Sequence, residues 1–296
     1  MASGVEAVSG SGPRIRPITT LDECRQVVAL EKDVWAYTDA EDVVPSPVLI
    51  VGVKRGAILL GAFDEAGAMK GFVYSIPAIK DGRLTQWSHM LGVVRETRES
   101  GLGRRLKLAQ RERALQMGID LIEWTFDPMQ AVNAHLNFAR LGVVAEEYEE
   151  NIYGESSSPL HRGTPTDRLV AEWKLAAPHV ERRIARDGVA LVRDASVGSA
   201  PVVNPSREGA TALVPGPADL RLDARRVLVE VPGGFSEMQI AEPTLALEWR
   251  LAVRTIFQAY FARGYRAVDF FLSSSSGRGH YLLAPIEAAE TREVSA

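Results

Sequence analysis

The chain has 296 residues, a formal charge of −4 and 46% hydrophobic residues, which is enough material for one large or two smaller domains. The slightly acidic balance disfavours a nucleic-acid partner, and no apolar run reaches the ~18 residues of a membrane span. Cys24 is the only cysteine, so we expect no disulfide framework and no cysteine-rich metal site. Together with a polar N-terminus that lacks a signal-peptide core, this favours a cytoplasmic protein.

The first part of the chain predicts one helix and a series of strands. After a leader that we expect to be disordered (residues 1–13), a strand at residues 14–18 is followed by Thr20-Leu21-Asp22-Glu23, which has the form of a capping box. A helix should begin there, because apolar residues then recur at helical spacing. Further strand-like stretches lie at residues 48–53, 57–64, 69–76 and 87–94.

The middle of the chain predicts a strand–helix–strand unit. A helix over residues 103–117 should end at Gly118, and the apolar residues 119–126 read as a buried strand parallel to residues 87–94. A short helix and two closing strands follow, at residues 133–141, 143–153 and 168–175. This order predicts a mixed α/β (α+β) fold, with a central, mixed, largely antiparallel sheet flanked by helices, over residues 14–176.

The C-terminal part predicts a smaller unit. Residues 177–226 are rich in Gly, Pro and Ser and are expected to connect, with short strands at 189–192 and 201–203. A β-α-β-β unit is predicted over residues 227–286, before a tail at 287–296. Its parts are a strand at 227–231, an amphipathic helix at 245–263 and strands at 265–272 and 281–283. Such a unit is thin for independent stability and should dock on the first domain, although it could also form a homodimer or partner surface.

A glycine-rich turn separates the strand at 87–94 from the helix at 103–117. The unpaired N–H groups and the dipole of a helix N-terminus favour an anion, and Gly101 and Gly103 would let a phosphate approach the backbone. No Lys-Ser or Lys-Thr follows, as a Walker loop requires, and Leu106 stands where a dinucleotide fingerprint needs its third glycine. Two interpretations therefore remain open: a phosphate-binding turn and a plain strand-to-helix turn with a glycine N-cap.

The pattern Arg-x-x-Gly-x-Gly after a Leu-Gly-Val strand resembles the acyl-CoA-binding motif of the GNAT N-acyltransferases. The order of elements over residues 14–175 resembles that family as well. Asn133, in a segment that ends at Leu141-Gly142, resembles the start of the family's second cofactor helix, although Val143 replaces the usual aromatic residue. The resemblance implies that acyl-CoA is held by Leu91, Gly92, Val93, Arg98, Glu99, Ser100, Gly101, Leu102, Gly103, Arg104 and Asn133.

In that family the loop amides hold the CoA pyrophosphate, and the strand that corresponds to residues 120–126 splays away to admit pantetheine. The co-substrate implied is acetyl-CoA or another acyl-CoA. The chain looks like a predicted-acetyltransferase branch, and some relatives of that branch sit in pathways that N-succinylate amino acids. No metal is expected, because the five histidines share no metal-like spacing.

Acyl transfer to an amine needs a base, an oxyanion donor and an acid for the leaving thiolate. The backbone N–H of Val93 is the oxyanion candidate. His89 and Glu123 are base candidates, although His89 could simply pair within the sheet or face solvent, and Glu123 could be structural. Tyr148 and Tyr153 are acid candidates, with a half-buried strand tyrosine as the alternative for each.

The acceptor is expected to be a small amine or an amino acid. His161, Arg162 and Arg168 could frame it. Arg250 and Arg254 could bind an acceptor carboxylate, although salt bridges with Glu248 or solvent exposure are the alternatives.

The sequence thus predicts an acyltransferase that moves an acetyl or succinyl group directly to an amine. The alternative is a non-catalytic CoA-binding or regulatory protein that keeps the cleft. Acetylation of proteins is disfavoured if the C-terminal unit covers the acceptor groove.

Overall fold

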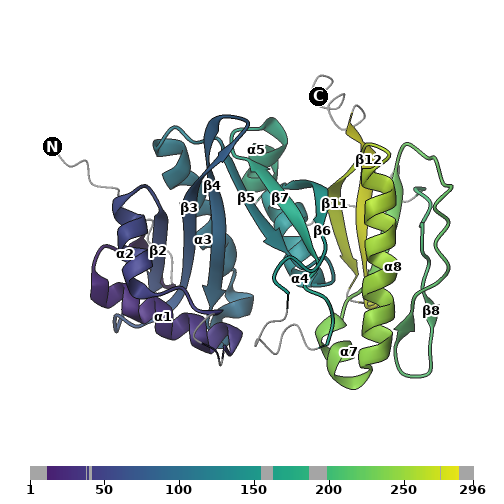
Figure 1. Ribbon diagram of the computed structural model, residues 1–296, viewed down its shortest axis with the longest axis horizontal. Helices are drawn as coiled ribbons and strands as arrows, with labels where there is room; N and C mark the ends of the chain where they lie inside the picture. The colour runs from purple at the N-terminus through teal and green to yellow at the C-terminus, as the bar shows by residue number, and fades with distance from the viewer. Residues whose placement is uncertain are drawn as a thin grey trace.

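The structure, a computed structural model, describes residues 12–37, 39, 42–154, 163–186, 199–273 and 275–286, without the side chains of Arg98 and Glu99. Ten strands form one mixed sheet in the order β1-β2-β3-β4-β5-β7-β6-β11-β12-β10, and β8 pairs with β9 separately. The predicted mixed α/β class is therefore confirmed. Figure 1 shows the sheet crossing the molecule, with α1 and α8 in front of it and α3 behind.

The N-terminal part begins with a capped helix and an antiparallel meander. Its elements are β1 (Arg14–Pro17), α1 (Leu21–Trp35), α2 (Ser46–Lys54), β2 (Ile58–Phe63), β3 (Met69–Lys80) and β4 (Arg83–Val93). The predicted capping box is confirmed, because the Thr20 side chain accepts from the Glu23 backbone N–H and the Glu23 side chain reaches back. The strands β3 and β4 are longer than predicted and meet at a tight turn, Asp81-Gly82, where both residues have positive φ.

The strand predicted at residues 48–53 is wrong, because these residues lie in α2. Pro47 occupies the first helical turn, where a missing N–H leaves no hydrogen bond unmade. The run of Val and Ile favoured a strand locally, but only one face of it is buried, with Leu49 against α1 and Val51 exposed. Tertiary packing along one face therefore decided for the helix.

The central unit follows the predicted order. Its elements are a 3₁₀ turn η2 (Arg95–Ser100), α3 (Leu102–Gln116), β5 (Leu121–Phe126), α4 (Ala131–Ala134), a π-helical turn η3 (His135–Leu141), β6 (Val144–Glu149) and β7 (Arg168–Lys174). The helix α3 ends before Gly118, whose φ of 75° fits the predicted glycine stop. The predicted parallel pairing of β5 with β4 is confirmed.

The C-terminal part extends the same sheet. Its elements are α5 (Pro178–Ala185), β8 (Arg207–Glu208), β9 (Leu213–Val214), β10 (Val227–Pro232), α7 (Phe235–Ala241), α8 (Pro243–Phe261), β11 (Tyr265–Ser273) and β12 (Arg278–Pro285). The helices α5 and α7 were not predicted, and α5 lies at the start of the segment expected only to connect. Of the two strands expected in the connection, 189–192 lies outside the described residues, and 201–203 forms a bridge from Val202 to Leu228.

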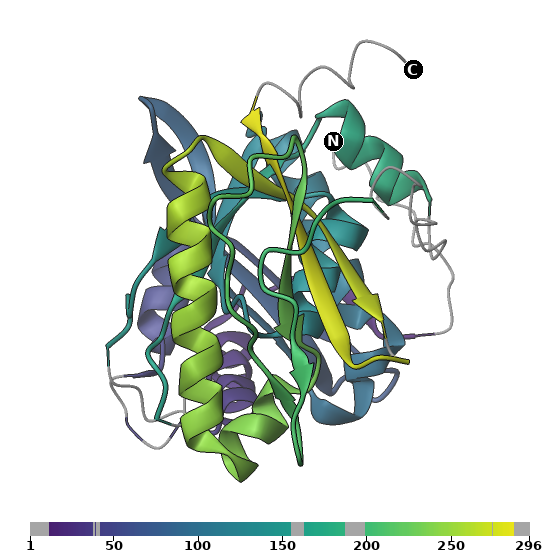
Figure 2. The same ribbon diagram turned by 90° about the vertical axis from the view of Figure 1, so that its right-hand side faces the viewer.

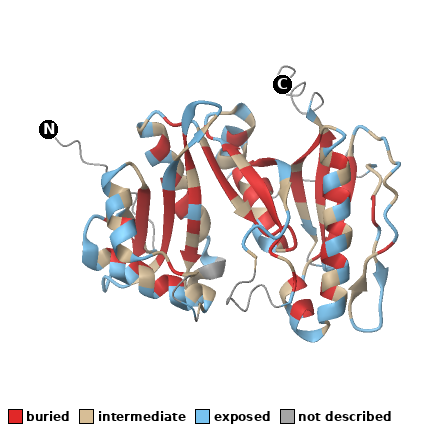
Figure 3. Cartoon of the chain, in the orientation of Figure 1, coloured by how far each residue is buried: buried red, intermediate tan, exposed pale blue. Residues whose placement is uncertain are grey.

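A single registered pair, Ala145 with Ala267, joins β6 to β11, but the core beneath this junction is continuous. The Tyr281 ring of β12 meets Phe138 of η3 at 5.6 Å and Phe257 of α8 at 5.1 Å between centroids. Figure 2 views this end of the molecule, where α8 runs alongside β11 and β12, and Figure 3 shows buried residues along the strands and the inner side of α8. Within the described ranges, no helix has the length and apolar character needed to span a bilayer.

Candidate active site

The parallel strands β4 and β5 separate soon after they meet. Their registered pairs are Gln86 with Ile122 and Trp87 with Glu123. Beyond Trp87, the residues of β4 other than His89 keep their ladder with β3 on the other side. The divergence leaves one edge of β4 facing a gap in the sheet instead of a strand ladder, and an extended, amide-bearing molecule can pair with such an edge.

A β-bulge marks the start of this divergence. The register of β3 and β4 passes from Ser75–Ser88 to Tyr74–Met90, so His89 is the extra residue. Its exposed ring stands edge-on to Tyr74, with the centroids 6.4 Å apart. Partial desolvation by the surrounding protein nevertheless lowers the pKa of His89, which favours the neutral imidazole at pH 7. His89, a predicted base, thus lies where β4 and β5 begin to diverge, a region called the splay below.

The glycine turn leads directly from β4 into α3. Gly101 precedes α3 with a φ of 77°, a conformation that side chains other than those of Gly, Asn and Asp rarely adopt. At Gly103 an added Cβ would be 3.8 Å from Leu91, which is ordinary contact, so the protein's own packing does not demand a glycine there. The absent side chain leaves the backbone N–H groups of the first turn accessible to an anion.

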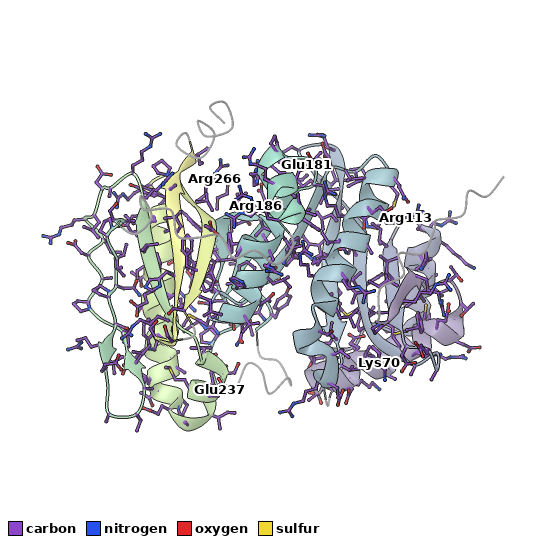
Figure 4. The ribbon with its side chains drawn as sticks, turned by 180° about the vertical axis from the view of Figure 1, so that it is seen from behind. Lys70, Arg113, Glu181, Arg186, Glu237 and Arg266 are labelled. Atoms are coloured by element: carbon purple, nitrogen blue, oxygen red, sulfur yellow. The ribbon has the colours of Figure 1, made fainter. Side chains whose placement is uncertain are left out.

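The other predicted cofactor residues divide into two groups. Leu91 and Val93 pack against the core beside α3, and Gly92 has no room for a side chain, because a Cβ would lie 2.9 Å from Phe72 and 3.3 Å from Trp35. Leu102 is buried, and the Ser100 hydroxyl donates to a carbonyl of the 3₁₀ turn. Arg104 instead donates to the carbonyl of Ile184 on α5, and Asn133 is exposed on α4. Figure 4 shows the far side of the molecule, where α3, with Arg113, and α5, with Glu181, face the viewer.

A buried lysine occupies the vertex of the splay. Lys107 of α3 is 2% exposed, and its amine lies 2.9 Å from Ser88 Oγ and 3.6 Å from the ring centre of Trp124. Ser88 and Trp124 are the first residues of β4 and β5 after their last registered pair. Gln110 completes a closed set of hydrogen bonds with Ser88 and Lys107. Burial drives the pKa of Lys107 well below its ordinary value, which favours the neutral amine.

The stability of the wild type relative to Lys107→Met should rise with pH. Because the pKa of Lys107 is depressed in the folded protein, the unfolded chain binds one proton more than the folded chain until the pH exceeds the ordinary lysine pKa of 10.5. Between the folded and the unfolded pKa, the free energy of unfolding of the wild type should rise relative to that of Lys107→Met by as much as about 1.4 kcal/mol per pH unit. Urea unfolding of both proteins at about pH 7 and about pH 9.5 measures it. A stability difference that does not change with pH would show instead a charged amine held by Trp124.

Glu123, the second predicted base, lies in an ion-paired position. Its carboxylate is 2.6 Å from Lys80 Nζ, and Lys80 also binds Glu172 at 2.7 Å, directly opposite Glu123 in the β5–β7 ladder. Desolvation opposes the charge on Lys80, but the hydrogen bonds to Glu123 and Glu172 outweigh it and raise the pKa of Lys80. These contacts favour the structural alternative for Glu123.

The two tyrosines predicted as acids point to different places. The Tyr148 hydroxyl donates to Asp167 at 2.8 Å and its ring stacks on Phe257 of α8, where desolvation and Asp167 raise the pKa of Tyr148. Tyr153 instead shares a hydrogen bond of 2.6 Å with Thr125 of β5. Of the two, Tyr153 lies beside the strand that splays from β4.

Tyr37, Tyr153 and Arg168 lie near one another, and the sequence pointed only to the last two. The guanidinium of Arg168, at the start of β7, lies 5.3 Å from the ring centre of Tyr153. Desolvation, together with Asp42, Glu31 and Tyr153, raises the pKa of Tyr37 to about 12, while Arg168 opposes the shift. Tyr37 therefore lies within electrostatic range of both β7 and the Tyr153 segment. His161 and Arg162 lie outside the described residues.

The arginines of α8 do not reach toward an acceptor. Arg250 is 1% exposed and binds both carboxylate oxygens of Asp127, at 2.5 and 2.8 Å. Arg254 binds both oxygens of Asp167, at 2.7 and 2.8 Å. The expected salt bridges with Glu248 are wrong, because these carboxylates at the ends of β5 and β7 lie closer once α8 is docked. The two arginines tie the C-terminal part to the rim of the site.

No protein-family model and no curated protein matches this chain. Solved structures of acetyltransferases do align with about half of it. They include a GNAT-family acetyltransferase from Streptococcus pneumoniae (19% identity, TM-score 0.42, 53% of this chain and 96% of that one). They also include the PaiA N-acetyltransferase from Thermoplasma acidophilum in complex with coenzyme A (14%, 0.40, 54% and 98%) and the ribosomal-protein-S18-alanine N-acetyltransferase from Escherichia coli (13%, 0.44, 55% and 94%).

Proposed function

We propose that the chain is an acyl-CoA-dependent N-acyltransferase with a GNAT-type site. The observation that carries this proposal is the divergence of β4 and β5 at the His89 bulge, next to a helix N-terminus that Gly101 introduces. The free edge of β4 suits the amide groups of pantetheine, and the first turn of α3 suits a pyrophosphate. The two features lie in line, so one extended cofactor can use both and point its thioester at the bulge.

The proposed reaction needs no covalent enzyme intermediate. The amine nitrogen attacks the thioester carbonyl carbon, the C–N bond forms, and the C–S bond breaks as the electron pair leaves with sulfur. A backbone N–H of β4, for which Val93 is the candidate, holds the oxyanion. The neutral imidazole of His89 can take up a proton from the amine, and the Tyr153 hydroxyl can supply one to the thiolate.

A small amine or an amino acid is the proposed acceptor. Tyr37, in the connection after α1, lies within electrostatic range of Tyr153 and Arg168, and the Arg168 guanidinium is 5.3 Å from the Tyr153 ring centre. Aromatic side chains suit a small acceptor, and a guanidinium at this position would complement an acceptor carboxylate. The acyl group can be acetyl or succinyl, and both are included in the test.

Calorimetric titration with acetyl-CoA and succinyl-CoA, followed by a free-thiol assay with a panel of amines and amino acids, tests the proposal. We expect one acyl-CoA to bind and thiol release to rise with one class of amine. Binding without amine-dependent thiol release on a broad panel would favour the non-catalytic CoA-binding alternative. Absence of any acyl-CoA binding would refute the proposed site.

A further inference from the structure

Glu31 of α1 carries a carboxylate that packing alone does not explain. The residue is 1% exposed, and its Oε1 accepts a hydrogen bond of 3.0 Å from the backbone N–H of Val44. Its Oε2 is buried and has no hydrogen-bond partner in the part of the chain that the structure describes. A buried, half-satisfied carboxylate is costly, so a glutamine or a leucine would serve the fold better here.

The position of Glu31 connects it to the splay. Glu31 lies one helical turn before Trp35 on the same side of α1, and Trp35 covers Gly92 on the cofactor strand. Trp35 also stacks on Tyr37, with the centroids 6.1 Å apart. The end of α1 thus covers β4. Glu31 lies within electrostatic range of Tyr37, and so does Arg168 of β7.

The surroundings of Glu31 bring its proton affinity into the neutral range. Burial raises the pKa of Glu31 to about 7, while the Val44 N–H and Lys32 on the same helix oppose the shift. Tyr37, with Asp42 beside it, is the titratable group that faces Glu31 from the connection after α1. A carboxyl group that titrates near pH 7 can both accept a proton and release it during turnover.

We propose that Glu31 pairs with the acceptor's ammonium ion through its unpartnered oxygen and takes its first proton, an inference that rests on the acyltransferase function proposed above. The ammonium group gives one proton to Oε2, and the neutral amine then attacks the thioester carbon. His89 takes the second amine proton, Tyr153 supplies one to the thiolate as the C–S bond breaks, and all three groups then exchange protons with solvent. An ammonium ion pairs with the unpartnered oxygen and so compensates its burial.

Glu31→Gln tests the proposal with the Val44 contact preserved. We expect kcat/KM for the amine to fall about 100-fold, as for the loss of a general base, while the Kd for acyl-CoA changes less than about twofold. The pH profile of kcat/KM should lose its rise near pH 7. Asp22→Asn, which removes an exposed carboxylate near the start of the same helix, is the matched control and should leave both values unchanged.

Two outcomes separate this inference from the proposed function. If the wild type turns over and Glu31→Gln keeps its kcat/KM and its pH profile, Glu31 is not the base, whereas the acyltransferase function stands. If acyl-CoA fails to bind the wild type, the proposed function fails, and Glu31 is then decided by its own titration. Carbon-13 NMR of the glutamate carboxyl groups should show one signal, absent in Glu31→Gln, that titrates near pH 7 and moves to lower pH with methylammonium. A titration near pH 4.5, or no response to methylammonium, would overturn the inference.

The unfolding temperature also tests the proposal, because a purely stabilising carboxylate at position 31 would make Glu31→Gln unfold at a lower temperature. A carboxyl group whose pKa is raised in the folded protein does not lower the free energy of unfolding below its ordinary pKa of 4.5. Its destabilising effect begins above that pH and reaches its full size once the pH has risen through 7. Glu31→Gln should therefore unfold at a higher temperature than the wild type at about pH 8 and at a similar temperature at about pH 5. A lower unfolding temperature at both pH values would show that the carboxylate serves stability instead.

Discussion

Replacement of Gly101 by aspartate is expected to reduce acyl-CoA affinity about 1000-fold or more. The new carboxylate would stand within ~4 Å of the pyrophosphate, where two like charges repel by about 4 kcal/mol near a protein surface. No atom lies within 4 Å of a Cβ built at this position, so the fold has room for the side chain. Aspartate is also one of the few residues that tolerate the φ of 77°. Calorimetric titration with acetyl-CoA measures the loss.

Gly101→Asn is the matched control for this variant. Asparagine has the same shape as aspartate and tolerates the same backbone conformation, so it introduces the same strain without the charge. We expect its affinity for acetyl-CoA to stay within about tenfold of the wild type. Equal affinities of the two variants would show that the turn does not hold the pyrophosphate.

Loss of the Arg250 guanidinium is expected to destabilise the protein by about 3–5 kcal/mol, because Asp127 would remain buried without its partner. Arg250 is 1% exposed and Asp127 is 8% exposed, so water cannot replace the interaction. Desolvation alone would raise the pKa of Asp127, but Arg250 holds it below its ordinary value. Urea unfolding of Arg250→Met at neutral pH, followed by tryptophan fluorescence, measures the change.

The double variant Arg250→Met with Asp127→Asn removes both charges and is expected to recover much of the lost stability. Replacement of a whole buried ion pair is often close to neutral, whereas loss of one partner is not. If the double variant were as unstable as the single variant, the effect would lie in the packing of α8 and not in the unpaired charge. A single cooperative transition in all three proteins would show that the C-terminal part unfolds together with the first.

Local patterns in the sequence were sufficient to predict the backbone of the glycine-rich turn and of the elements next to it. A capping box, a glycine at a helix stop and a strand–turn–helix with two glycines depend on contacts within a few residues, so their spacing carries the information. The order of the strands around β4 and β5 follows from the right-handed crossover, which is also a local rule. These local features predict the position of the glycine-rich turn and the parallel pairing of β4 with β5 without any knowledge of side-chain packing.

The acceptor side depended on tertiary contacts instead. The helical spacing already places Glu31 on the apolar face of α1, four residues after Val27, but its single hydrogen bond arises only when the chain returns at Val44. The same holds for Arg250, whose nearest carboxylate in the chain is not its partner in space. The spacing of Glu123 in an apolar strand suggests a base, but Lys80, 43 residues away, binds its carboxylate.

The sequence by itself determined the fold class, the glycine-rich turn and the parallel pairing of β4 with β5, because short-range backbone chemistry specifies each of them. The tertiary structure alone decided which polar groups are buried, paired or left with an open oxygen, because burial and pairing are properties of surfaces that meet from distant parts of the chain. For this protein that difference separates the donor site, which the motif predicted, from the proton chemistry proposed for Glu31.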